Sequence, residues 1–115
     1  MVKLNEKTNI IDGIDARMME YLLEPYTFTA KEYEDEYEGI IMWSNEFDIW
    51  GSGKTKEAAI KDLAAEILDF SKEFFEKFDI WVKGREAQIP YLLKAIILND
   101  IDKLGGLITC RPGEI

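Results

Sequence analysis

The 115-residue sequence contains no histidine and a single cysteine, Cys110. Without histidine, the chain lacks the commonest general base and the commonest metal ligand of proteins. One thiol excludes an internal disulfide framework and a cysteine-based zinc site. The apolar stretches are short and interrupted by charges, far below the roughly 20 residues that a membrane helix needs. We therefore expect no membrane span, no cofactor and no enzyme built on these residue types.

Basic residues are scarce relative to acidic ones. The chain has 14 Lys and Arg against 23 Asp and Glu, which gives a formal net charge of −9 at pH 7. Because nucleic-acid phosphates are bound by clustered Lys and Arg, this balance argues against a nucleic-acid interface. It is typical of a soluble protein or of one that docks on a basic partner. Residues 1–9 are polar, so we expect no secretory signal and a cytoplasmic location.

Hydrophobic residues make up 47% of the chain, which is enough for one packed core. We predict a single domain over residues 1–115, since this length suits one core rather than two. A helix is expected over residues 16–23, with Asp15 as its N-cap and Pro25 as its stop. Alternating apolar and polar residues predict three strands, at residues 26–33, 37–43 and 47–50.

The strongest helical pattern covers residues 56–78 and follows Thr55, a suitable N-cap. Residues 80–82 are either a strand or a continuation of this helix. The tail, residues 79–115, is predicted as a C-terminal helical extension, with a helix over residues 90–104 and a last strand at residues 107–110. The expected fold is α+β: a small antiparallel sheet of three to four strands packed on one long helix, with short flanking helices.

One face of the predicted sheet would pack on the long helix, and the other face also carries large apolar groups. We expect the N-terminal helix, the C-terminal helix or another subunit to cover that second face. The aromatic residues, including Trp43, Trp50 and Trp81, are interpreted as core residues.

Residues 51–59 read Gly-Ser-Gly-Lys-Thr-Lys-Glu-Ala-Ala. A phosphate-binding loop requires a first glycine five residues before its Gly-Lys-Thr, and Asp48 stands at that position. A glycine turn followed by a helix cap is therefore favoured over nucleotide binding.

The same segment resembles the HicB-like antitoxins, in which a third strand runs through a Gly-Asp-Thr-x-Glu-Glu-Ala turn into a long helix. Four positions match this turn: Gly53, Thr55, Glu57 and Ala59. Lys54 and Ala58 stand where that family has Asp and Glu, and residues 45–48 replace its usual Pro-Gly. The family also begins with a Pro-Tyr strand and an acidic hairpin, as Pro25-Tyr26 and residues 34–37 do here. The resemblance covers residues 22–78 as a β-β-β-α unit.

This resemblance implies an antitoxin that neutralises a small basic RNA-cleaving toxin by occluding its active site. It also implies a homo-oligomer and a protein without cofactor or catalytic residues. In that family the C-terminal part often binds an operator DNA. The predicted second helix carries only Lys94 and Lys103 as basic residues, which argues against operator binding here.

The densest run of one charge lies at the link between the first two strands, at Glu34, Asp35 and Glu36. We predict these residues to be the contact for the toxin, with a merely solvated hairpin as the alternative. A metal site is less favoured, because neither an EF-hand spacing nor a turn glycine is present. Two other functions stay open: a module that dimerises or binds a small ligand without any toxin, and a carboxylate-based hydrolase using Glu34 or Glu36.

Overall fold

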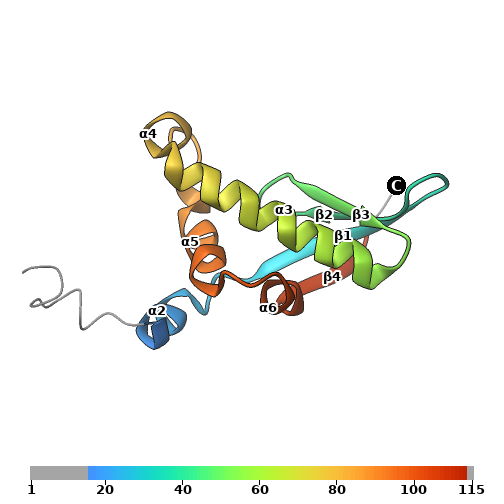
Figure 1. Cartoon of the computed structure of the whole chain (residues 1–115), viewed down its shortest axis with the longest axis horizontal. Helices are drawn as coiled ribbons and strands as arrows, with labels where there is room; N and C mark the ends of the chain where they lie inside the picture. Colours follow the sequence, from blue (N-terminus) through green and yellow to red (C-terminus); the bar gives the residue numbers. More distant parts are fainter. Residues whose placement is uncertain (1–15, 114–115) are drawn as a thin grey trace, which may run out of the picture.

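The long helix α3, Lys56–Glu76, spans most of the molecule (Figure 1). The computed structural model of the chain describes residues 16–113. As predicted, α3 begins after Thr55, whose hydroxyl accepts a hydrogen bond from the Ala58 backbone N–H at 3.1 Å. It ends two residues earlier than predicted, at Glu76, with Lys77 as its C-cap. One stripe of the helix is buried, at Ala59, Leu63, Ala64, Ile67, Leu68, Ser71 and Phe74. This spacing of three and four residues turns one helix face toward the sheet.

The sheet has four strands in the order β3-β2-β1-β4. They are β1 (Phe28–Asp35), β2 (Gly39–Ser44), β3 (Trp50–Gly53) and β4 (Ile108–Pro112). The first three form the expected antiparallel meander before α3, which confirms the β-β-β-α order. The fourth strand differs from the expected antiparallel sheet, because β4 pairs with β1 in parallel. A strand from the C-terminal tail, β4, therefore adds a fourth strand to the sheet of the β-β-β-α unit.

The third strand was predicted at residues 47–50, and this prediction is wrong. Strand β3 begins at Trp50 and runs through the glycines that were expected to end it. Helix α3 crosses this strand so closely that a Cβ on Gly51 would lie 2.3 Å from the Leu63 backbone nitrogen. Glycine is therefore required inside the strand, although it normally weakens one. Residue Phe47 instead lies in the preceding turn, where it is buried.

The tail forms short helices rather than one long one. They are α4 (Phe78–Trp81), the 3₁₀ helix η1 (Glu86–Gln88), α5 (Ile89–Leu98) and α6 (Ile101–Gly106). The predicted helix over residues 90–104 is divided because Asn99 adopts a left-handed backbone with φ 44°. The next residue, Asp100, then caps α6 by accepting the Lys103 backbone N–H at 2.9 Å. Ile80 and Trp81 lie in helix α4 and Val82 is its C-cap, so these residues are helical rather than a strand, in a short helix separated from α3 by Lys77.

Helix α2, Ala16–Leu23, confirms the predicted N-terminal helix and packs against α5. Its predicted N-cap, Asp15, lies outside the described residues. Within residues 16–113, no helix is both long enough and apolar enough to cross a membrane.

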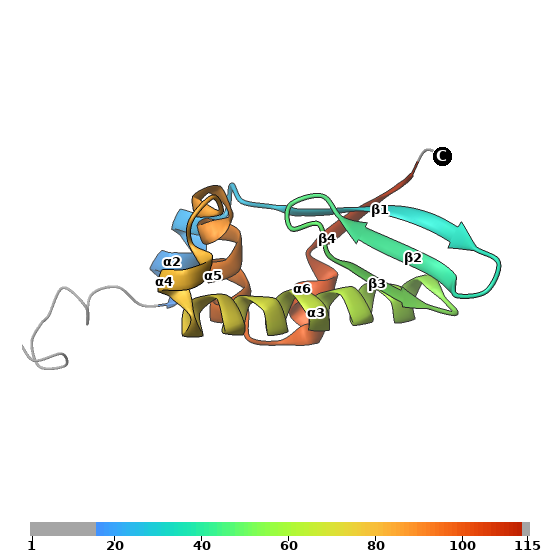
Figure 2. The same cartoon turned by 90° about the horizontal axis from the view of Figure 1, so that it is seen from above.

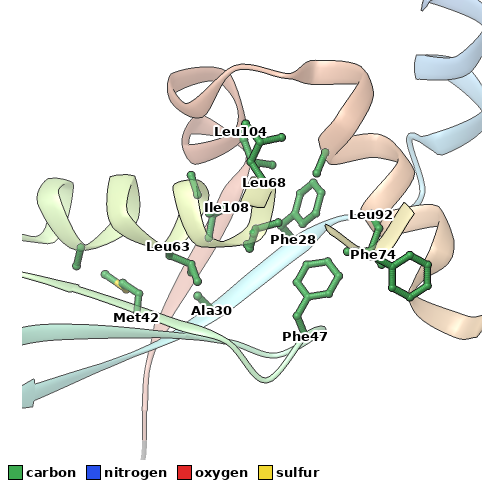
Figure 3. Packing of buried hydrophobic residues seen from close by; sticks show 14 residues of the cluster. Phe28, Ala30, Met42, Phe47, Leu63, Leu68, Phe74, Leu92, Leu104 and Ile108 are labelled. Atoms are coloured by element: carbon green, nitrogen blue, oxygen red, sulfur yellow. The ribbon is translucent and has the colours of Figure 1, made fainter. Parts of the chain in front are cut away.

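The core lies between α3 and the sheet and continues under α5 and α6. Figure 3 shows Met42 and Ala30 of the sheet near Leu63, with Phe28 and Phe47 nearer the C-terminal helices. Met42, Leu63, Leu92 and Leu104 are fully buried. Burial of such side chains contributes about 1.5–3 kcal/mol each, so this contact is the main stabilising element of the fold.

Candidate functional site

The described helices leave one face of the sheet uncovered. Figure 2 shows α3 and α6 on one side of the sheet, with α2, α4 and α5 gathered at one end of the molecule. Of the three coverings expected from sequence, the N-terminal helix α2 and the C-terminal helices do not lie on the opposite side, and another subunit stays a prediction. Side chains of β1, β2 and β3 form this open face, at Lys31, Tyr33, Ile41, Trp43 and Trp50.

Two tryptophans stack on the open face, toward its β3 margin. Trp43 and Trp50 are paired across β2 and β3, with ring centroids 5.2 Å apart and planes inclined by 7°. Trp50 remains 52% exposed. Their interpretation as core residues is therefore wrong, whereas Trp81 does pack against the core. The missed signal is strand alternation: Met42 points into the core, so its neighbour Trp43 must point away from it.

Trp50 borders two hollows, one on the open face and one at the β3 edge of the sheet, where residues of α3 also contribute. The larger hollow has a volume of about 630 Å³. It is lined by Lys31, Tyr33, Glu38, Ile41, Trp43, Asn45 and Trp50. A smaller one, of about 330 Å³, is lined by Asp48, Ile49, Trp50, Ser52, Asp62 and Glu66. Trp50 thus separates two hollows whose rims carry carboxylates.

The predicted contact residues Glu34, Asp35 and Glu36 lie together at the β1–β2 hairpin, where the open face ends. Asp35 accepts hydrogen bonds from the backbone N–H groups of Tyr37 at 2.9 Å and Glu38 at 2.8 Å. Its carboxylate therefore closes the turn, as Asp side chains commonly do. Glu34 and Glu36 are exposed, and neighbouring strand residues such as Glu34 and Asp35 point to opposite faces.

Two further residues of the hairpin, Tyr37 and Glu38, lie next to the predicted contact residues. Glu38 reaches the larger hollow of the open face. Tyr37 is 91% exposed at the hairpin turn. Glu38 therefore connects the hairpin turn to the hollow of the open face, and Tyr37 adds an exposed aromatic ring beside the carboxylates.

The remaining polar groups are not arranged for catalysis or metal binding in the part of the chain described. No group of three or more His, Cys, Asp or Glu residues within 16–113 is placed to hold a metal ion. The free Cys110 is half-buried on β4, and this burial raises the pKa of its thiol. Lys56 lowers that pKa and Glu32 raises it, each to a smaller extent. The raised pKa keeps Cys110 protonated and poorly nucleophilic near neutral pH.

An uncovered aromatic sheet face beside an acidic hairpin has the features that distinguish interaction sites, which are exposed apolar patches with polar rims. A family described as "Antitoxin of toxin-antitoxin, RelE / RelB, TA system" matches residues 1–110. The chain belongs to this antitoxin family. Its membership confirms the antitoxin class predicted from the resemblance and favours a non-enzymatic role, while the family description does not name HicB.

The fold is also found in a solved structure from Syntrophomonas wolfei subsp. wolfei, described as the antitoxin part of a proposed toxin/antitoxin system. The two folds agree with a TM-score of 0.77 at 23% sequence identity, over 86% of this chain and 72% of the other. This likeness extends to the α+β fold and carries no residue-level assignment. No curated protein matches the chain.

Proposed function

We propose that this antitoxin neutralises a small, basic, RNA-cleaving toxin by covering its active site. Membership of a toxin–antitoxin family supplies the partner, a toxin. An enzyme that holds RNA needs a basic groove for the phosphates. A chain of net charge −9 with exposed carboxylates at one hairpin is complementary to such a groove.

The hairpin carries this proposal. It presents Glu34 and Glu36 to solvent at the end of a two-stranded projection, where a partner meets no steric obstacle from the described helices. Opposite charges across an interface chiefly accelerate association and fix its register. We assign Glu34 and Glu36 to toxin contact, and Asp35 to holding the turn that presents them.

The HicB-like character of residues 22–78 is part of the proposal. It is supported by the order of three antiparallel strands before a capped helix, and by Gly53 and Thr55 at that junction. A homo-oligomer is proposed on the same resemblance. The cationic side chains near the tail, Lys94 and Lys103, line a groove beside α2. Lys94 donates to the Tyr26 carbonyl at 2.9 Å, so it is engaged within the fold and offers little to an operator.

The function is tested with the product of a short, basic reading frame adjacent to the gene of this chain. That product is purified and incubated with a labelled RNA oligonucleotide and increasing amounts of the antitoxin. We expect RNA cleavage to stop at a stoichiometric ratio. Cleavage that persists in excess antitoxin, or a product that cleaves no RNA, contradicts the proposal.

The role of the hairpin is tested separately by charge reversal. In the variant Glu34→Lys with Glu36→Lys, Asp35 is retained so that the turn still closes. The matched control, Glu76→Lys with Asp79→Lys, makes the same charge change at the far end of the molecule. We expect the hairpin variant to associate with the toxin roughly ten-fold more slowly at low salt, and with weaker salt dependence, than the control. Equal association rates for the two variants exclude the hairpin as the contact.

A further inference from the structure

We propose that the stacked pair Trp43 and Trp50 is the anchor on which the toxin docks, and that it receives a cationic side chain of the toxin together with apolar neighbours. This inference rests on the proposed function and names the surface that performs it. The site is the open face itself, so the hairpin acts as a steering rim and the tryptophan pair as the centre of the contact.

The first observation is that aromatic side chains of the open face are exposed to water. Trp50 is 52% exposed on the edge strand β3, and it lines one hollow together with Tyr33 and Ile41 of the neighbouring strands. A monomeric protein seldom leaves aromatic residues gathered on one face without a partner. Tryptophan is also the residue type most enriched among those that dominate binding at interfaces.

The second observation is the distribution of charge around the pair. Carboxylates line both hollows beside Trp50: Glu38 in the hollow of the open face, and Asp48, Asp62 and Glu66 in the hollow at the β3 edge. Away from Trp50, the residues beside Trp43 are basic. Lys31 of β1 is paired with Trp43, and Arg111 of β4 is paired with Lys31. The β3 margin around Trp50 is thus acidic, and the open face becomes basic toward β4. An Arg or Lys of the partner placed over Trp50 would make a cation–π contact with the ring and charge-assisted hydrogen bonds with the nearby carboxylates.

The net charge favours a basic protein over a second copy of the chain. Two copies meeting through their open faces would bring together molecules that each carry a net charge of −9. Like charges across an interface oppose association, whereas a basic toxin gains from the same groups. The uneven rim also gives the partner one preferred orientation.

The experiment compares Trp50→Ser with Tyr21→Ser, using the toxin purified as described above. Tyr21 is a matched control, because it is 78% exposed on α2, away from the open face. Affinity is measured by calorimetry, and folding of each variant by circular dichroism and thermal melting. We expect Trp50→Ser to weaken toxin binding roughly 30-fold, as loss of a central interface residue does, and Tyr21→Ser to leave it unchanged. Trp50→Phe should restore most of the affinity, since it retains an aromatic face.

The outcomes separate this inference from the proposed function. If the parent chain inhibits the toxin and Trp50→Ser inhibits it equally well, the function stands and the docking surface is wrong. A parent chain that fails to bind overturns both. If sedimentation of the antitoxin alone shows that Trp50→Ser dissociates an oligomer while toxin affinity is unchanged, the open face is a contact between copies and the inference is overturned.

Discussion

The two faces of the same sheet follow opposite rules. On the helix-covered face, Met42 and Ala30 pack against α3 and are almost fully buried. On the open face, Trp43 and Trp50 stack in contact with water, although Trp43 directly follows the buried Met42 along β2. Because neighbouring residues of a strand point to opposite sides, one short strand can serve stability and recognition at once. The difference teaches that hydrophobicity alone does not identify a core residue. In a strand, burial depends on whether the side chain points to the helix-covered side of the sheet or to the open side.

The largest expected effect comes from a charge placed on the covered face. Ile67 is 1% exposed in the core beneath the sheet. The change Ile67→Asp buries a carboxylate without a partner, and we expect a loss of about 4 kcal/mol or more in the free energy of unfolding. Urea denaturation measures it, with Lys72→Asp on the exposed side of α3 as the control. A loss below about 1 kcal/mol would mean that the helix register is incorrect.

A second test addresses the close contact between α3 and β3. In Gly51→Ala the new methyl group meets the Leu63 backbone, which cannot rotate away, so the helix must shift. We expect a loss of about 2–3 kcal/mol, as overpacked sites show. Gly106→Ala is the control, since a Cβ there has no neighbour within 4 Å. Equal melting temperatures for the two variants would contradict the close packing.

A smaller effect is expected at the start of α3. Removing the Thr55 hydroxyl by Thr55→Ala leaves the Ala58 N–H without its capping partner. The expected loss is about 1 kcal/mol, measured by thermal melting. Thr55→Ser retains the hydroxyl and should melt close to the parent. A larger loss for Thr55→Ala than for Ile67→Asp would reverse the order that the packing predicts.

The smallest effect on stability is expected on the open face. Trp50→Ser removes a stacked but half-exposed ring, so the free energy of unfolding should fall by no more than about 1 kcal/mol. The same urea titration measures this change. A loss as large as that of Ile67→Asp would show that the open face belongs to the core, and the contrast between the two faces would disappear.

Much of the fold could be predicted from sequence, where local chemistry and periodicity agree. The long helix after Thr55 and the three-stranded meander follow from such signals. Strand β3 was misplaced because Gly51 and Gly53 read as a turn, and only the approach of α3 explains glycine in a strand. The division between α5 and α6 depends on the left-handed Asn99, which apolar spacing does not reveal.

The candidate site was predicted less well, for a related reason. The acidic hairpin was visible as a run of charge, and the structure places its three residues together at one turn. The role of Asp35 within that turn, and the exposure of Trp50, depend on where each strand ends and which way it faces. A one-residue difference in a strand assignment changes which side chains are buried.

The hydrogen bond between the Ser52 backbone N–H and the Asp62 carboxylate, at 2.9 Å, has a consequence for how partners approach. Strand β3 forms one margin of the sheet, and this bond occupies a donor that would otherwise invite an additional strand. At the other margin, Pro112 has no N–H to donate. Both lateral margins are thereby made poor templates for chain-by-chain growth into fibrils. A partner protein is therefore expected to bind the open face of the sheet rather than one of its edges.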